Sequence, residues 1–191
     1  MIKHDEELLA QLTKIAYKDL DGLAEYDKIL LECKERLMSK GSALCGMFFP
    51  EPELSKYFIY KGKLTKNEKK KHFVYHFDDK KRLRITERWD GDGDLLDYIF
   101  YYYYDQSIEI IHFNLKEKLI DKVGFIDYEN GSLIRFVDTD VLLYVRNNEP
   151  VKYYVEYDFI KDKEYVLERH FALDVYSDGR EWLVNTKMKK R

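Results

Sequence analysis

Three carboxylates have the spacing in this chain that most resembles a chemical site, in Asp90-Gly91-Asp92-Gly93-Asp94. Alternating acids of this kind open an EF-hand calcium loop, which also needs glycine at its sixth position and glutamate at its twelfth. This chain has Leu95 and Tyr101 at those two positions. We therefore interpret the segment as a solvated acidic hairpin turn and predict no metal centre, with weak cation binding by Asp90, Asp92 and Asp94 as the alternative.

Histidine and nucleophile patterns point away from catalysis. The five histidines are scattered, at His4, His72, His76, His112 and His170. His72 and His76 fall on one face of a strand, but the extended chain separates them by roughly 13 Å, too far to share a metal ion. The sequence contains no phosphate-binding glycine loop, no Gly-x-Ser-x-Gly elbow and no cysteine with a placed histidine. We expect no enzyme and no cofactor, with a divalent-metal hydrolase built on Asp and Glu as the alternative.

Lysines form two runs, and they suggest a different kind of site. One run surrounds Asn67 and the other closes the chain: Lys61, Lys63, Lys66, Lys69, Lys70 and Lys71, then Lys187, Lys189, Lys190 and Arg191. With Phe58, Tyr60 and Phe73 nearby, the first run has the residue types of a groove for single-stranded nucleic acid. The near-neutral total charge favours a solvated loop and tail instead. A nucleic-acid-binding module is therefore our second functional hypothesis.

An acidic stretch followed by aromatic residues is the basis of our leading hypothesis. Glu87, Asp90, Asp92, Asp94 and Asp97 lie within eleven residues, and Tyr98-Ile99-Phe100-Tyr101-Tyr102-Tyr103-Tyr104 follows. A strand with aromatic residues on both faces needs a cover for each face. We predict a protein-binding surface in which Asp90, Asp92, Asp94 and Asp97 steer a partner and Tyr101 and Tyr103 anchor it. The alternative is that a curled sheet or the N-terminal helices cover both tyrosines.

The elements that must position these residues begin with a helical segment at about 5–40. Apolar residues recur there at spacings of three and four, which is typical of helices buried on one side. These residues are Leu8, Leu9, Leu12, Ile15, Ala16 and Leu20, and then Leu23, Tyr26, Leu30, Cys33 and Leu37. We predict two helices, or one helix broken at Gly22, ending near Gly41.

The remainder, about 47–188, changes to a period of two. Apolar residues alternate with polar ones in 73–77, 83–89 and 151–159, as in strands with one buried face. Short polar turns separate these segments, including Glu129-Asn130-Gly131 and Ser177-Asp178-Gly179. The connections are too short for the helices that parallel pairing requires. The predicted fold is therefore α+β, an N-terminal helical hairpin packed on a large antiparallel β-meander of nine or ten strands.

Composition agrees with a soluble globular chain. The 191 residues carry a net charge of −3, and 36% are charged while 45% are hydrophobic. This length suits a single domain over 1–191. The 17 tyrosines and 11 phenylalanines favour β-sheet. Two cysteines without a framework of spacings, and an N-terminus that turns acidic before any apolar run, are typical of a reduced cytoplasmic protein. A disulfide between Cys33 and Cys45 is the alternative.

Two segments resemble single Tyr-Asp repeats of bacterial wall-associated and toxin-delivery proteins: Tyr128-Glu129-Asn130-Gly131-Ser132-Leu133 and Tyr176-Ser177-Asp178-Gly179-Arg180. More broadly, a short helical start before a Tyr-rich meander resembles the small immunity proteins encoded beside bacterial polymorphic toxins. The resemblance implies a non-enzymatic inhibitor that covers the active site of a toxin domain. Together with the acidic stretch, it leads us to expect a cationic partner such as a nuclease, and no membrane association.

Overall fold

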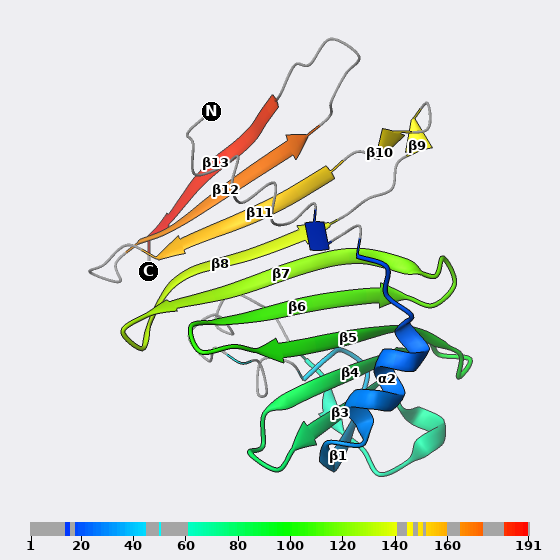
Figure 1. The fold of residues 1–191 in the computed structure, drawn as a ribbon. Helices are drawn as coiled ribbons and strands as arrows, with labels where there is room; N and C mark the ends of the chain where they lie inside the picture. Colours follow the sequence, from blue (N-terminus) through cyan, green and yellow to red (C-terminus); the bar gives the residue numbers. More distant parts are fainter. Residues whose placement is uncertain are drawn as a thin grey trace. The chain divides into compact units, whose positions relative to one another are not determined.

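The structure is a computed structural model that describes residues 14–15, 18–44, 50, 61–140, 145–146, 149–150, 152–159, 165–173 and 182–190, with side chains described through residue 137. The chain divides into two compact units (Figure 1). The first, here called the α2 unit, contains Leu20–Tyr102 and His112–Leu119. The second, called the β7 unit, contains Met1–Asp19, Tyr103–Ile111 and Ile120–Arg191.

Helix α2, Gly22–Leu30, is one of the two helices that the sequence predicts. It begins after Asp21, whose carboxylate accepts hydrogen bonds from the backbone N–H groups of Leu23 and Ala24 at 3.1 Å, as an N-cap residue does. Gly22 is buried because the Phe113 ring lies against it, and a Cβ at this position would be 2.3 Å from Phe113 Cδ1. Of the other predicted helix, only residues 14–15 and 18–20 are described, and 14–15 are helical.

The predicted helix does not continue to residue 39, because Cys33–Lys40 forms strand β1. This part of the helical prediction, and with it the helical hairpin, is wrong. Cys33 and Leu37 are four residues apart, and a spacing of four fits a helix and also a strand of period two. Pairing with strand β3 decides between them: Ser39 is 0% exposed and its hydroxyl lies 3.2 Å from the Tyr75 hydroxyl.

The sheet of the α2 unit contains β1, β2 (Lys63–Leu64), β3 (Phe73–Asp78), β4 (Leu83–Trp89) and β5 (Leu95–Tyr103), and a short 3₁₀ helix η2 (Glu68–Lys70) precedes β3. Its strand order is β2-β1-β3-β4-β5, and the neighbouring strands pair antiparallel. The largest fully buried side chains of this unit include Tyr75, Tyr101, Phe100, Ile29 and Leu83. Helix α2 packs on this sheet, with the Tyr26 ring stacked on the Tyr98 ring at 4.4 Å.

The β7 unit continues the same pattern. Its strands are β6 (Ser107–Asn114), of which residues 107–111 belong to this unit, β7 (Leu119–Glu129), β8 (Ser132–Asp140), β11 (Lys152–Phe159), β12 (Tyr165–Leu173) and β13 (Trp182–Lys190). They lie in the order β6-β7-β8-β11-β12-β13. Two short strands, β9 (Val145–Arg146) and β10 (Glu149–Pro150), pair with each other in a separate sheet. Asn130 and Gly131 connect β7 to β8 with φ values of 49° and 74°, which suit a tight hairpin turn.

Antiparallel pairing of successive strands is confirmed from β3 to β5, from β7 to β8 and from β11 to β13, but β1 lies between β2 and β3, so that part of the sheet is not a meander. The predicted strands at 73–77, 83–89 and 151–159 correspond to β3, β4 and β11. The turn predicted at 129–131 lies between β7 and β8, whereas the turn predicted at 177–179 lies outside the described residues. We predicted one domain over 1–191, and the structure resolves that range into two compact units.

Candidate functional site

A buried carboxylate lies at the centre of the α2 unit. Glu87 of β4 is 4% exposed. Its Oε1 atom accepts hydrogen bonds from the Tyr26 hydroxyl at 2.8 Å and from His76 Nε2 at 2.7 Å. Its Oε2 atom accepts a hydrogen bond from the Trp89 indole N–H at 2.7 Å. Residues from α2, β3 and β4 therefore meet at this one side chain.

The electrostatics of this network follow from its burial. Burial raises the pKa of the Glu87 carboxyl, but the hydrogen bonds from His76, Tyr26 and Trp89 outweigh it and leave that pKa below its usual value. Burial, together with the hydrogen bond to Glu87, raises the pKa of the Tyr26 phenol. Burial, and then the charge of Glu87, raises the pKa of Tyr98 to about 12. Tyr26 and Tyr98 are therefore neutral at physiological pH.

A hollow of about 640 Å³ lies beside this network. It is lined by Tyr26, Leu30, Cys33, Lys34, Glu35, Arg36, Lys71, His76, Glu87 and Trp89. Both oxygens of Glu87 already accept hydrogen bonds, so this carboxylate has little capacity left to act as a base. Cys33 is a free thiol that donates to the Ile29 carbonyl at 3.4 Å, and burial raises its pKa.

Charged side chains surround the hollow at the surface. Arg36 of β1 donates to Glu68 Oε1 at 2.6 Å and to Glu68 Oε2 at 3.3 Å. Lys71 lies 3.2 Å from the same carboxylate, and its ammonium is 3.8 Å from the centre of the Trp89 ring. The hydrogen bonds from Arg36 and Lys71 lower the pKa of Glu68 to about 2.

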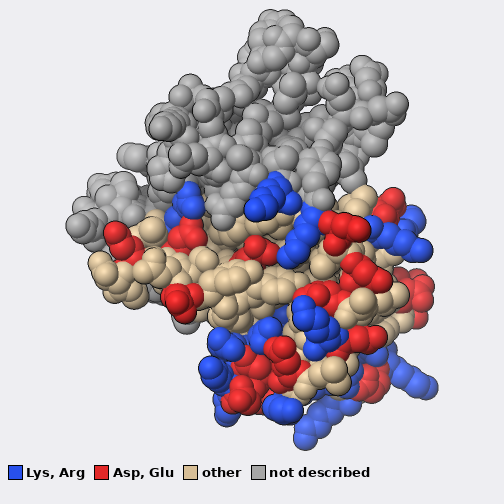
Figure 2. Space-filling view, viewed as in Figure 1, with Lys and Arg blue, Asp and Glu red and all other residues tan. Residues whose placement is uncertain are grey.

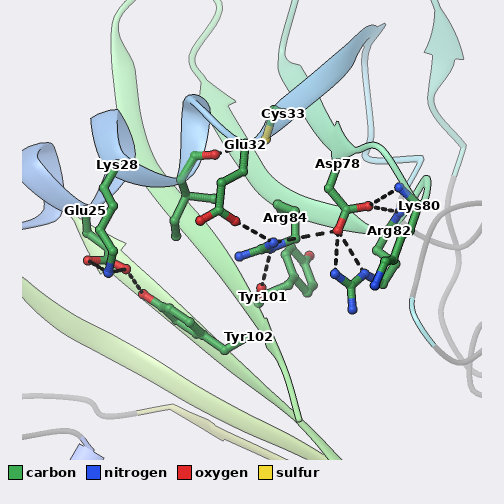
Figure 3. A network of polar contacts seen from close by, with 11 residues as sticks. Glu25, Lys28, Glu32, Cys33, Asp78, Lys80, Arg82, Arg84, Tyr101 and Tyr102 are labelled. Carbon is green, nitrogen blue, oxygen red and sulfur yellow. Dashed lines mark hydrogen bonds and ion pairs between the residues drawn. The ribbon is translucent and has the colours of Figure 1, made fainter. Parts of the chain in front are cut away.

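A second polar network joins the end of α2 to β3 and β4 (Figure 3). Arg84 donates to Glu32 at 2.9 Å and to the Tyr101 carbonyl at 3.3 Å, and it lies 3.6 Å from Asp78. Asp78 also accepts from the Arg82 side chain at 2.8 Å. Burial raises the pKa of Asp78, but the backbone and side chain of Arg82 outweigh this and lower it. This network closes the β3–β4 hairpin.

The predicted acidic turn lies between β4 and β5 and has a defined conformation. Asp90 Oδ1 accepts hydrogen bonds from the backbone N–H groups of Asp92, Gly93 and Asp94 at 2.9, 2.8 and 2.9 Å. These backbone donors lower the pKa of Asp90. Gly93 has a φ of 95°, a value that glycine adopts without strain. Asp92 and Asp94 are exposed.

Two other predicted binding residues lie in the interior. Asp97 is 3% exposed and pairs with Arg88, which donates from Nε at 2.5 Å. Tyr101 is 2% exposed. Neither side chain is presented to a partner, because the pairing of β4 with β5 and the packing of the sheet enclose them. Tyr103 is half-buried. Of the predicted set, Asp92 and Asp94 are the fully exposed members.

The lysine run is exposed except at its last member, and of its predicted aromatic partners only Phe73 lies within the described residues. Lys61, Lys63, Lys66, Lys69 and Lys70 are exposed, whereas Lys71 is half-buried. The Phe73 ring stacks on the Tyr75 ring at 6.4 Å. Phe58, Tyr60 and the C-terminal basic residues lie outside the residues whose side chains are described.

Sequence reasoning missed the Glu87 network. We placed Glu87 in an acidic stretch and considered His76 only as a metal ligand, yet Glu87 is 4% exposed and His76 is 5% exposed. A signal was available in the hairpin itself: β3 and β4 pair with Val74 opposite Glu87 and His76 opposite Ile85. His76 and Glu87 are therefore diagonal neighbours on one face, a relation that the short turn at 79–82 makes accessible to prediction.

The comparisons with known proteins add no assignment, since no family model, curated protein or solved structure matches this chain. The described side chains contain no group of three His, Cys, Asp or Glu residues that could hold a metal ion. No helix in the described part of the chain has the length and apolar character needed to cross a membrane.

Proposed function

We propose that this protein is a non-catalytic binding protein whose partner is a positively charged protein. In its most specific form, the proposal is a cytoplasmic immunity protein that covers the active site of a bacterial toxin domain. The observation that carries it is the acidic turn, in which Asp90 fixes the backbone and Asp92 and Asp94 extend into solvent.

The turn has the properties of a steering element. Its exposed carboxylates lie outside the sheet, where they attract a cationic surface before contact is made. Charges in such positions act mainly on the association rate and on its salt dependence. Asp97 no longer belongs to this set, because its buried carboxylate pairs with Arg88.

An aromatic anchor is available next to the turn. Trp89 ends β4 immediately before Asp90 and is half-buried, with its indole N–H held by Glu87. A tryptophan that is partly exposed and already fixed in orientation is a common centre of a protein interface. We propose Trp89 as an anchor in place of the buried Tyr101, and Tyr103 remains a second predicted anchor.

The test begins with capture of the partner from the native cell by the tagged full-length chain. Association with the purified partner is then followed by surface plasmon resonance at low and at physiological ionic strength. For Asp92→Lys with Asp94→Lys, we expect the association rate constant at low salt to fall about tenfold or more, because steering is reversed. The proposal also requires that the wild-type chain inhibit the activity of the captured toxin domain.

Asp105→Lys with Glu129→Lys is the matched control, since both are also exposed acids, Asp105 in the turn after β5 and Glu129 at the end of β7. The two control substitutions change the net charge equally and should alter the rate much less. Equal rates for the two double variants would remove the acidic turn from the interface. Capture of a partner that the chain binds without inhibiting would reject the immunity role while leaving a binding role.

A further inference from the structure

Part of the outer edge of β1 has no strand paired with it among the described residues. β1 pairs with β3 from Cys33 to Ser39 on one side, with a register shift between Cys33 and Glu35. On its other side it pairs with β2 only at Ser39 and Lys40. Within the described part of the chain, no strand lies along the outer side of Lys34–Leu37.

The hydrogen bonds at the paired end show which backbone groups face outward. The Ser39 carbonyl accepts from His72 N–H at 2.8 Å, toward β3, and the Met38 carbonyl accepts from Thr65 N–H at 2.9 Å, toward β2. In an antiparallel strand the N–H and C=O of one residue point to the same side, and successive residues alternate. Arg36 therefore directs its backbone N–H and C=O outward, as Met38 does. Unpaired groups of this kind are a template for another strand.

The side chains around this edge are mainly basic. Lys34 and Arg36 are exposed on β1, with one exposed acid, Glu35, between them. The segment that contains β2 and η2 adds exposed lysines, namely Lys63, Lys66, Lys69 and Lys70. In the space-filling view, Lys and Arg side chains lie among Asp and Glu side chains over the described part of the molecule (Figure 2). Arg36 and Lys71 already hold one carboxylate, that of Glu68.

We propose that the outer edge of β1, at Lys34–Arg36, binds an extended acidic segment of another protein as an added strand. The backbone of that segment pairs with Arg36, and its carboxylates face the surrounding Lys and Arg side chains. Alternate side chains of an added strand point to the same face, so one set can enter the hollow lined by Leu30, Cys33 and Arg36. This inference does not depend on the acidic turn.

The same observations disfavour the other possible occupants. Single-stranded nucleic acid has no backbone that completes a β-ladder, and it requires open aromatic faces. The Phe73 ring is stacked on Tyr75, and the Trp89 ring is covered on one side by Lys71. A second copy of this edge would place Lys34 and Arg36 near the same basic residues of its partner, where like charges repel.

The experiment uses a fluorescent peptide of alternating Glu and Thr, with binding followed by anisotropy at increasing salt. The first control is a pair of peptides of the same sequence with N-methylated amides, one methylated at the odd residues and the other at the even residues. One of these two peptides should bind about tenfold more weakly than the unmodified peptide, because it lacks the donors that pair with the edge. The second control is a peptide of alternating Lys and Thr, which should not bind.

Variants of the protein separate the backbone from the charge. Arg36→Pro removes the outward N–H, and Arg36→Ala keeps it while removing the same side-chain charge, so the proline variant should bind more weakly than the alanine variant. Lys69→Glu with Lys70→Glu should weaken binding, whereas the exposed control Lys80→Glu with Lys116→Glu should weaken it less. Thermal unfolding of each variant checks that the fold is retained. The methylated peptides test backbone pairing with the unsubstituted protein, so that result does not depend on whether Arg36→Pro folds.

Four results would overturn the proposal. The first is no binding of the Glu-Thr peptide at low salt. The second is equal binding of the unmodified peptide and both methylated forms, which would show a purely electrostatic contact. The third is tight, salt-dependent binding of oligo-dT without peptide binding, which would assign the lysines to nucleic acid. Self-association that Arg36→Pro abolishes would likewise replace the proposal with a dimer.

Discussion

Glu87 determines the polar interior of the α2 unit at the level of single residues. Three donors from different elements converge on its two oxygens: Tyr26, His76 and Trp89. A buried carboxylate without such partners would be strongly unfavourable. The arrangement therefore links α2 to the β3–β4 hairpin, and it also fixes the orientation of the Trp89 ring next to the acidic turn.

Glu87→Gln should destabilise the protein by about 2 to 4 kcal/mol in its free energy of unfolding, because the new amide group directs N–H donors toward existing donors. Urea unfolding followed by tryptophan fluorescence measures the change. Glu117→Gln, an exposed residue in the turn after β6, is the control and should change stability by less than about 0.5 kcal/mol. Equal midpoints for the two variants would contradict the role given to Glu87.

The same carboxylate predicts a pH dependence. Its folded-state pKa lies below its usual value, so its contribution to stability is complete above the unfolded-state pKa of about 4.3. That contribution is lost as the pH falls through the lower folded-state pKa. The stability difference between wild type and Glu87→Gln should therefore be constant near neutrality and shrink below about pH 4.3. Urea unfolding at a series of pH values tests this, and a difference that grows in acid would reverse the sign.

At the level of elements, the packing of α2 depends on its first residue. The Phe113 ring lies where a Cβ on Gly22 would be, with Cδ1 at 2.3 Å and Cε1 at 2.4 Å. Helix α2 approaches this ring closely because position 22 has no side chain. The hairpin that carries Phe113 and the helix are therefore fitted to each other.

Gly22→Ala should destabilise the protein by about 1 to 3 kcal/mol, because the new methyl group forces the helix or the ring to move. Phe113→Leu provides the test of cause. In the double variant the smaller side chain leaves room for the methyl group. The loss of stability in the double variant should therefore be smaller than the sum of the losses in the two single variants. Thermal or urea unfolding of the four proteins gives the coupling, and strictly additive losses would show that this contact does not limit packing.

The sequence was a reliable guide to elements whose pattern has only one interpretation. Strict alternation identified β3, β4 and β11, and Asn130-Gly131 identified the β7–β8 turn. β1 was misassigned because its apolar spacing fits both periods and pairing with β3 decides between them. The Glu87 network escaped prediction because its members come from three elements, and only the register between β3 and β4 brings His76 to Glu87. Burial of Tyr101 likewise depends on neighbouring strands.

At the scale of the whole molecule, the net charge of −3 contains local clusters of either sign. The acidic turn follows β4, and the basic residues surround the outer edge of β1. The acidic turn and the basic residues around β1 each produce a local electrostatic field, although the net charge is small. Salt screens each field over about 8 to 10 Å at physiological ionic strength.

This separation predicts independent effects of substitution. Asp92→Lys with Asp94→Lys should slow association with the cationic partner while reducing the affinity of the Glu-Thr peptide by less than about threefold. Lys69→Glu with Lys70→Glu should do the opposite. Measuring both ligands against both double variants, at more than one ionic strength, tests the separation. Parallel losses for both ligands in either variant would show that the two surfaces act as one.

The three hydrogen bonds that Asp90 accepts from its own turn have a consequence for encounter with a partner. The loss of conformational freedom in this loop takes place when the chain folds, before anything binds. A preorganised loop adds little entropic cost to complex formation, so the rate of docking depends on collision and orientation and not on loop rearrangement.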